Sequence, residues 1–169
     1  MKLKISCWTE ELSGQAENNL QLNEEVDFWT DWLNTPDEHN DIRVFIGAFE
    51  DAYLLGAAAA SFVKSKDSPQ DGIELNGLWV FPEHRGKGIS LNMILYIIDF
   101  FIPFGLTRME VYNPHFAPSN NFYIKFGGNV IEREYQMDGR LLVDIFDFDL
   151  CDLRSRIIKS LSFSTIHIR

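Results

Sequence analysis

The part of this sequence best suited to ligand chemistry is a polar turn between two apolar stretches. The turn, Glu83-His84-Arg85-Gly86-Lys87-Gly88, follows the apolar run Leu78-Trp79-Val80-Phe81. Pro82 ends that run, because proline cannot donate to a strand ladder. The strongly apolar segment from Ile89 to Phe101 comes next and is long enough for a helix. The pattern predicts a strand, a glycine-rich basic turn and the start of a helix.

Such a turn suits a phosphate group. Unpaired backbone N–H groups at the positive end of a helix dipole attract an anion. Gly86 and Gly88 let the backbone approach a bulky anion closely. Arg85 and Lys87 add positive charge in a chain whose formal net charge is −10.

Two segments together resemble a known family. Val80-x-Pro82-x-x-Arg85-Gly86-Lys87-Gly88-Ile89 resembles the acetyl-CoA-binding segment of the GNAT superfamily of N-acetyltransferases, Arg/Gln-x-x-Gly-x-Gly/Ala, with Ser90 at the last position. Downstream, Asn121-Phe122-Tyr123-Ile124-Lys125-Phe126-Gly127 resembles the family's Phe-Tyr-x-Lys-x-Gly marker. The segments occur in the family's order and spacing, and the resemblance covers roughly residues 43–150.

The resemblance implies acetyl-CoA as the cofactor. Backbone groups of Leu78, Trp79 and Val80 would pair with the pantetheine arm like an added strand. The residues whose N–H groups would hold the pyrophosphate are Arg85, Gly86, Lys87, Gly88, Ile89 and Ser90. The region around Asn120 would run close to coenzyme A, although Phe116 stands where many members have asparagine. The alternative is an ordinary corner between a strand and a helix.

The resemblance also implies catalytic roles. Tyr123 would donate a proton to the leaving thiolate, since a phenol with a pKa of about 10 stays protonated at neutral pH. The alternative is a tyrosine packed in the core. Glu74 would deprotonate the amine, and Glu110 is the second candidate, because a partly buried carboxylate makes a better base. A salt-bridged or exposed Glu74 is the competing interpretation.

Acidic residues dominate the N-terminal third. Arg43 is the only base between Thr9 and Asp51, against twelve acids. By resemblance, the helices of this region form one wall of the acceptor site, so the acids would attract a cationic amine. Alternatively they are the solvated faces of surface helices, as charge runs usually are.

Composition excludes several classes. A net charge of −10 argues against nucleic acid as a partner. Cys7 and Cys151 are isolated, which indicates neither a disulfide framework nor a zinc site and fits the reducing cytoplasm. The N-terminus lacks an apolar signal core. No apolar stretch reaches the ~20 residues of a membrane span.

We expect a single α/β (α+β) domain over residues 1–150, with a C-terminal helix and tail over 151–169 packed on it or at a homodimer contact. By resemblance, its sheet would be mixed, mostly antiparallel and seven-stranded, splayed after the fourth strand, with helices on both faces. The patterns predict helices from Thr9 and over residues 23–33, 87–101, 119–126 and 151–161, and strands over 2–8, 43–50, 53–64, 72–81, 108–112, 129–136 and 141–150. The tail from Ser162 to Arg169 alternates like a further edge strand.

The expected activity is acetyl transfer from acetyl-CoA to a primary amine by direct attack, with no metal. A cationic small molecule is the first choice of acceptor, such as a polyamine, an aminoglycoside-like compound or a lysine-like amine. A protein N-terminus or lysine is the alternative. Two rivals stay open, a non-catalytic CoA-binding sensor and an acyltransferase for longer acyl chains.

Overall fold

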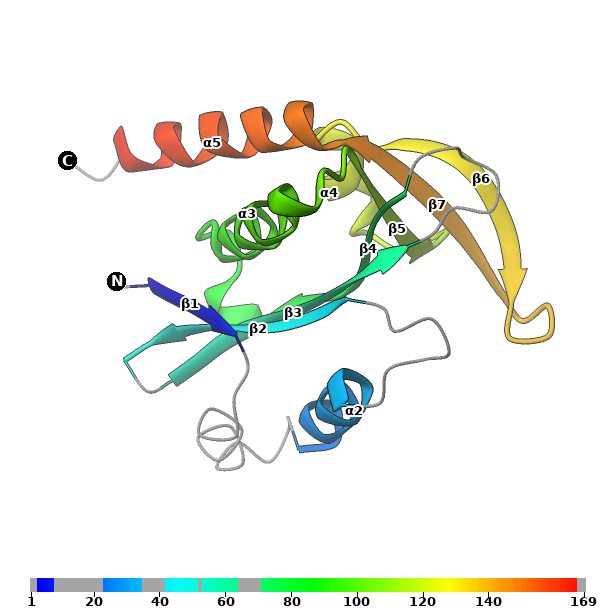
Figure 1. Ribbon diagram of the computed structural model, residues 1–169, viewed down its shortest axis with the longest axis horizontal. Helices are drawn as coiled ribbons and strands as arrows, with labels where there is room; N and C mark the ends of the chain where they lie inside the picture. The colour runs from blue at the N-terminus through cyan, green and yellow to red at the C-terminus, as the bar shows by residue number, and fades with distance from the viewer. Residues whose placement is uncertain (1–2, 8–22, 35–41, 52, 64–70, 167–169) are drawn as a thin grey trace. The chain divides into compact units, whose positions relative to one another are not determined.

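The computed structural model describes residues 3–7, 23–34, 42–51, 53–63 and 71–166. In these ranges the chain forms a seven-stranded sheet and four α-helices (Figure 1). The strands are β1 (Leu3–Cys7), β2 (Arg43–Glu50), β3 (Tyr53–Val63), β4 (Gly72–Val80), β5 (Arg108–Pro114), β6 (Asn129–Gln136) and β7 (Leu141–Asp149). The helices are α2 (Asn23–Asn34), α3 (Ile89–Phe101), α4 (Asn120–Lys125) and α5 (Leu150–Ile166).

The sheet has the strand order β1-β2-β3-β4-β5-β7-β6. β4 runs parallel to β5, and the pairs β1–β2, β2–β3, β5–β7 and β6–β7 are antiparallel. This confirms the expected mixed, mostly antiparallel α/β fold. The register between β4 and β5 joins Ile73 to Met109 and Glu74 to Glu110.

The chain divides into two compact units, which we describe separately. The first contains Met1–Phe62 and Gly77–Ile97, and the second contains Val63–Asn76 and Ile98–Arg169. Consequently β4 and α3 each contribute residues to both units.

In the first unit, α2 and the beginning of α3 lie on opposite faces of β1, β2 and β3 (Figure 1). Phe45 and Phe49 of β2 form a buried cluster with alanines of β3, and Trp29 of α2 packs against it. The run Ala57–Ala60 is almost completely buried. Its expected assignment to a strand is confirmed, because β3 pairs with β2 along this run.

In the second unit, β7 carries the buried aromatic residues Phe146 and Phe148. α5 follows β7 directly and buries Leu150, Leu153 and Ile157, which recur at helical spacing. The predicted edge strand after Ser162 is wrong where the structure describes it, because α5 continues to Ile166.

Other boundaries differ little from the expectations. α3 begins at Ile89 rather than Lys87, because the residues before it form the turn. Ser119 precedes α4 as expected but makes no side-chain cap bond. The helix predicted from Thr9 lies outside the described residues. None of the helices in the described ranges is long and apolar enough to span a membrane.

Candidate active site

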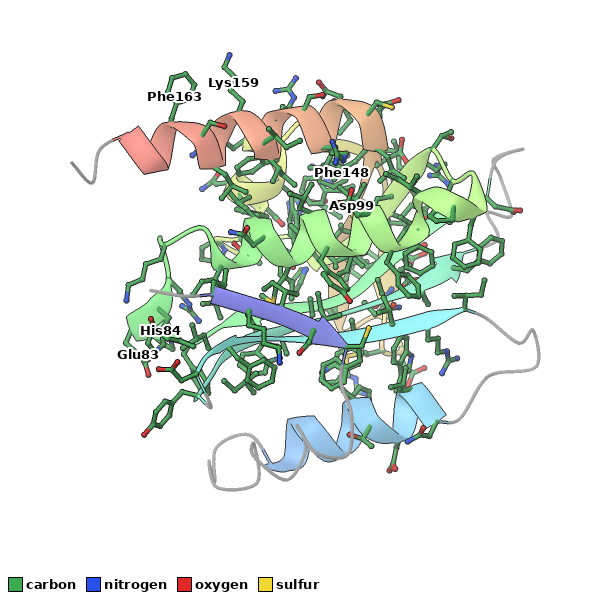
Figure 2. The ribbon with its side chains drawn as sticks, turned by 60° about the vertical axis from the view of Figure 1, so that its left-hand side comes forward. Glu83, His84, Asp99, Phe148, Lys159 and Phe163 are labelled. Atoms are coloured by element: carbon green, nitrogen blue, oxygen red, sulfur yellow. The ribbon has the colours of Figure 1, made fainter. Side chains whose placement is uncertain are left out.

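The glycine-rich turn of the first unit links β4 to α3. A short 3₁₀ helix over Pro82–His84 begins it, and Figure 2 shows Glu83 and His84 there. Gly86 and Gly88 have φ values of 74° and 76°. Glycine adopts this left-handed region without the steric cost that other residues meet. The turn therefore owes its shape to the two glycines that the sequence singled out.

The backbone amides of His84 and Arg85 donate to Phe81 and Pro82, whereas those of Gly86, Lys87 and Gly88 donate to no described acceptor. None of the turn and loop backbone bonds among the described residues is donated by residues 86–88. The first N–H groups of α3 also have no partner inside the helix. A Cβ placed on Gly86 would meet no atom within 4 Å. The arrangement is an open row of donors at a helix N-terminus, which fits a phosphate.

Two side chains donate hydrogen bonds to backbone carbonyl oxygens in and next to the turn. Arg85 Nε donates to the carbonyl oxygen of Val80 at 2.9 Å. Asn92 Nδ2 donates to the carbonyl oxygen of Gly88 at 2.8 Å. Both bonds use carbonyl oxygens, so they leave the N–H groups of residues 86–88 available. Sequence reasoning assigned Arg85 to anion binding, and the structure adds this contact within the turn.

The strand segment Leu78–Val80 is the last strand of the first unit. Its close neighbour is β3, since a Cβ on Gly56 would lie 2.5 Å from the carbonyl oxygen of Trp79. The register of β4 with β5 covers Ile73 and Glu74 alone. The backbone of Leu78–Val80 therefore lies beyond that pairing, as required for a ligand that adds to a strand edge.

The side chain of Trp79 belongs to the aromatic cluster under α2. It packs edge-on against Phe81, with 5.3 Å between the ring centroids. Trp29 closes over the neighbouring Gly77, where a Cβ would lie 2.6 Å from the indole. The indole Nε1 of Trp79 is buried and has no hydrogen-bond partner. A buried donor without a partner is costly, and a bound ligand could satisfy it.

In the second unit, Tyr123 lies on the inner face of α4. It is 8% exposed, and its ring centroid lies 5.4 Å from that of Phe146 and 6.3 Å from that of Phe148. Burial raises the pKa of Tyr123 to about 12. The phenol therefore stays protonated across the physiological range, as a proton donor must.

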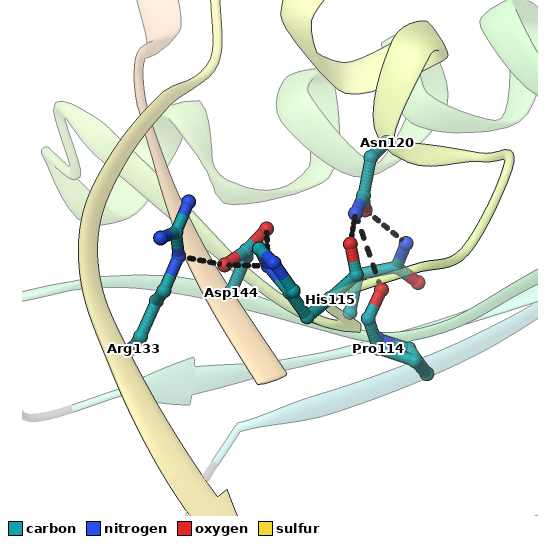
Figure 3. Close-up of polar contacts among 6 residues, drawn as sticks. Pro114, His115, Asn120, Arg133 and Asp144 are labelled. Atoms are coloured by element: carbon teal, nitrogen blue, oxygen red, sulfur yellow. Dashed lines mark hydrogen bonds and ion pairs between the residues drawn. The ribbon is translucent and has the colours of Figure 1, made fainter. Parts of the chain in front are cut away.

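Polar side chains bind the loop before α4 to the helix. Asn113 Nδ2 donates to Asn120 Oδ1 at 2.5 Å and to Ser119 Oγ at 2.8 Å. Asn120 Nδ2 donates to the carbonyl oxygens of Pro114 at 3.1 Å and His115 at 2.8 Å (Figure 3). The Asn120 side chain, predicted at the cofactor, is thus engaged within the loop and fixes the start of the helix that carries Tyr123.

The same loop is tied to β7 through a buried carboxylate. Asp144 is 4% exposed and accepts from His115 Nδ1 at 2.9 Å and Arg133 Nε at 2.7 Å (Figure 3). Burial by itself would raise the pKa of Asp144, but the bonds from His115 and Arg133 outweigh it and lower the pKa. A carboxylate only accepts hydrogen bonds, so Nδ1 of His115 must carry a proton.

Sequence reasoning missed this cluster. The structure holds His115 half-buried against Asp144. The one available signal was Asp144 between the apolar residues Val143 and Ile145 of β7.

The two predicted base candidates lie side by side in the second unit. Glu74 of β4 and Glu110 of β5 are register partners. Arg108 Nη2 donates to Glu110 Oε1 at 2.5 Å and to Asp147 Oδ1 at 2.7 Å. One oxygen of Glu110 is therefore occupied by a guanidinium.

The pKa of Tyr112 is affected by negative charge on this part of the sheet. The pKa of Tyr112 rises to about 12, through burial first and then through the charges of Glu110, Glu74, Glu134 and Glu132. Four carboxylates on β4, β5 and β6 thus act on one hydroxyl. Within the described ranges, no group of three or more His, Cys, Asp or Glu side chains could hold a metal ion.

The structure distributes the predicted site residues over both units. The cofactor turn and Leu78–Val80 belong to the first unit. Glu74, Glu110, Asn120 and Tyr123 belong to the second.

Comparisons with known proteins agree with these observations. A family model described as the acetyltransferase (GNAT) family matches residues 6–127. No protein with curated annotation matches the chain in sequence.

Solved structures share the fold. YncA, a putative acetyltransferase from Salmonella typhimurium with its cofactor acetyl-CoA, is 18% identical, with a TM-score of 0.60 over 89% of this chain and 95% of that one. The aminoglycoside 6'-N-acetyltransferase from Enterococcus faecium is 15% identical, with a TM-score of 0.62 over 87% and 97%. The ribosomal-protein-S18-alanine N-acetyltransferase from Escherichia coli is 14% identical, with a TM-score of 0.61 over 88% and 94%.

Proposed function

Because the chain belongs to the acetyltransferase (GNAT) family, we propose that it transfers the acetyl group of acetyl-CoA to a primary amine. The observation that carries this proposal is the open row of backbone donors at the start of α3, shaped by Gly86 and Gly88. Acetyl-CoA supplies the thioester whose acetyl group is transferred. The protein supplies binding, orientation and proton transfer, and holding two reactants together can lower the barrier by roughly 7–11 kcal/mol.

The residues of the first unit bind the cofactor in this proposal. The N–H groups from Gly86 to Ser90 hold the pyrophosphate, and Lys87 adds a positive charge. The backbone of Leu78–Val80 pairs with the pantetheine arm, as an extended ligand adds to a strand edge. Arg85 also adds positive charge there and closes the turn through Val80.

Tyr123 is the proton donor to the departing thiolate. Its raised pKa keeps the hydroxyl protonated, and that hydroxyl makes no hydrogen bond to any residue that the structure describes. Asn120 lies close to the cofactor in this proposal, and its side chain holds the preceding loop in position.

Glu74 is the base that accepts a proton from the amine, and Glu110 is the second candidate. Changing each to glutamine separates the two: the variant that shifts the acidic limb of the pH–rate profile has lost the base. Should neither variant shift the profile, a path through solvent replaces both.

A cationic amine is the proposed acceptor. The charges that Glu74, Glu110, Glu132 and Glu134 exert at Tyr112 favour a positive ligand on this part of the sheet. A protein N-terminus or lysine is the second candidate, supported by the fold shared with an enzyme named for a ribosomal protein.

Thiol release from acetyl-CoA across a panel of amines tests the proposal. The panel contains polyamines, aminoglycosides, lysine and peptides with free N-termini. Release that depends on a cationic small amine supports the first choice of acceptor, and release with peptides alone supports the second. Calorimetric binding of coenzyme A without release on any amine would favour a sensor, and the absence of coenzyme A binding would refute the proposal.

A further inference from the structure

A hollow of about 290 Å³ lies in the second unit, between the end of α4 and the side of α5. It is lined by Lys125, Phe126, Arg156, Lys159, Ser160 and Phe163. We propose that this hollow binds a small organic phosphate that also carries an apolar ring. None of these residues has a part in the acetyl transfer proposed above, so the inference stands apart from it.

The hollow has a built wall. A Cβ on Gly127 would lie 2.8 Å from Asp152 Oδ2 and 3.0 Å from Arg156 Nε, so the end of α4 packs directly against the ion pair on α5. That pair has an N–O distance of 2.7 Å and holds Arg156 in place. Phe126 is buried and forms the floor.

The side chains from α5 share one flank of the helix. Arg156, Ser160 and Phe163 recur at intervals of four and three residues, which places them on the same side. The buried stripe of α5 runs through Leu153 and Ile157, beside this flank. In Figure 2, Lys159 and Phe163 project away from the body of the helix.

The positively charged side chains that line the hollow favour an anionic ligand. Three cationic side chains line the hollow, and Asp152 balances one of them, which leaves two positive charges in excess. Neither Lys125 nor Lys159 forms an ion pair with the described residues. This local excess of positive charge contrasts with the formal net charge of −10 of the whole chain. A phosphate dianion matches it.

The aromatic side chains that line the hollow favour a ligand that also carries an apolar ring. Phe163 is 59% exposed, and Lys125 Nζ lies 5.6 Å from the centroid of the Phe126 ring. Apolar rings next to cations suit an anion with its own ring, because the ring buries apolar area while the phosphate meets the lysines. The volume suits a small molecule rather than a folded partner.

Titration of the full chain with phenyl phosphate, followed by amide NMR, tests the inference. We expect saturable shifts for residues 125–127 and 156–163. Inorganic phosphate and benzyl alcohol should each bind more weakly, since each lacks one half of the ligand. The double variant Lys125→Gln and Lys159→Gln should weaken phenyl phosphate at least roughly tenfold. The double variant Lys4→Gln and Arg140→Gln, at exposed positions that do not line the hollow, is the charge-matched control.

Three results would overturn the inference. The first is shifts confined to residues 85–90, or no saturable shifts. The second is equal affinity in the double variant, with its fold verified by circular dichroism. The third is displacement of phenyl phosphate by coenzyme A, which would make the hollow part of the cofactor site. These NMR titrations do not depend on acetyl transfer activity. The proposal for the hollow and the proposal of acetyl transfer can therefore be refuted independently.

Discussion

Two segments of this protein each lead into a helix, and they treat their polar groups in opposite ways. Before α3, the turn leaves the N–H groups of residues 86–88 without acceptors among the described residues and depends on positive φ values at Gly86 and Gly88. Before α4, the loop engages its polar side chains with one another and with β7. The first segment therefore offers free donors, which suits the phosphate binding proposed for it. The second is built to hold the helix that carries Tyr123.

The difference has a physical basis. Donors kept for a ligand must stay unpaired in the free protein, which costs stability. A catalytic side chain needs a fixed position, and hydrogen bonds to its supporting loop supply that. The comparison therefore predicts that substitutions in the turn weaken binding, whereas substitutions around α4 affect turnover or stability.

The largest effect is expected for Tyr123→Phe. Turnover should fall by about 100-fold or more, because general acid catalysis contributes that much, while the affinity for coenzyme A should change little. Steady-state kinetics and calorimetry measure the two. Tyr135→Phe, at an exposed position, is the matched control.

The pH dependence of turnover gives a second test of Tyr123 as the proton donor. Its pKa is raised to about 12, so the wild-type rate should show no loss between about pH 8 and 10 from its ionisation. Unchanged turnover in Tyr123→Phe would exclude the proton-donor role.

The next effect is expected for Gly86→Val. A β-branched residue at φ 74° is strained, so the turn should change shape and the affinity for coenzyme A should fall roughly tenfold or more. Gly105→Val is a close control, because Gly105 has φ 73° and equally open surroundings. Both variants should lose similar stability in urea unfolding. An equal loss of coenzyme A affinity in both would show that the turn has no special role.

A third effect concerns Asp144→Asn. Removing the buried charge should lower the free energy of unfolding by about 1–3 kcal/mol at neutral pH, since bonds to His115 and Arg133 lose their ionic character. The pKa of Asp144 is lowered in the folded state, so its contribution is present above the ordinary value of 3.8 and is lost as the pH falls through the folded-state pKa.

Urea unfolding of wild type and Asp144→Asn between pH 7 and about pH 3 measures this contribution. The difference between them should shrink in the acid part of the range. Asp138→Asn in the exposed β6–β7 turn should show no such difference. A constant difference at all pH values would mean that the Asp144 charge is not responsible.

The smallest effect is expected for Asn120→Ala. It should cost about 1 kcal/mol of stability and reduce turnover a few-fold, because its bonds to the preceding loop are lost. The exposed neighbour Asn121 supplies the control variant Asn121→Ala. If Asn120→Ala instead weakened coenzyme A binding at unchanged stability, its side chain would belong to the cofactor and not to the loop.

Local patterns predicted much of this fold because they are read over short distances. Alternation and apolar runs located all seven strands to within about two residues, and Gly86, Gly88 and Pro82 marked the turn. The strand predicted after Ser162 is wrong as far as Ile166, because the apolar residues of the tail fit both an alternating strand and a helix of period 3.6. Continuity with α5 decided between them.

The sequence by itself determined the strand–turn–helix unit, its glycines and the Tyr123 helix, since each depends on neighbours in the chain. Only the tertiary structure decided what surrounds them. It paired His115 with Asp144, set Arg108 against Glu110 and gathered three cations around one hollow. Those contacts join residues from different elements, and their strengths depend on burial and distance. Neither quantity can be read from the order of amino acids.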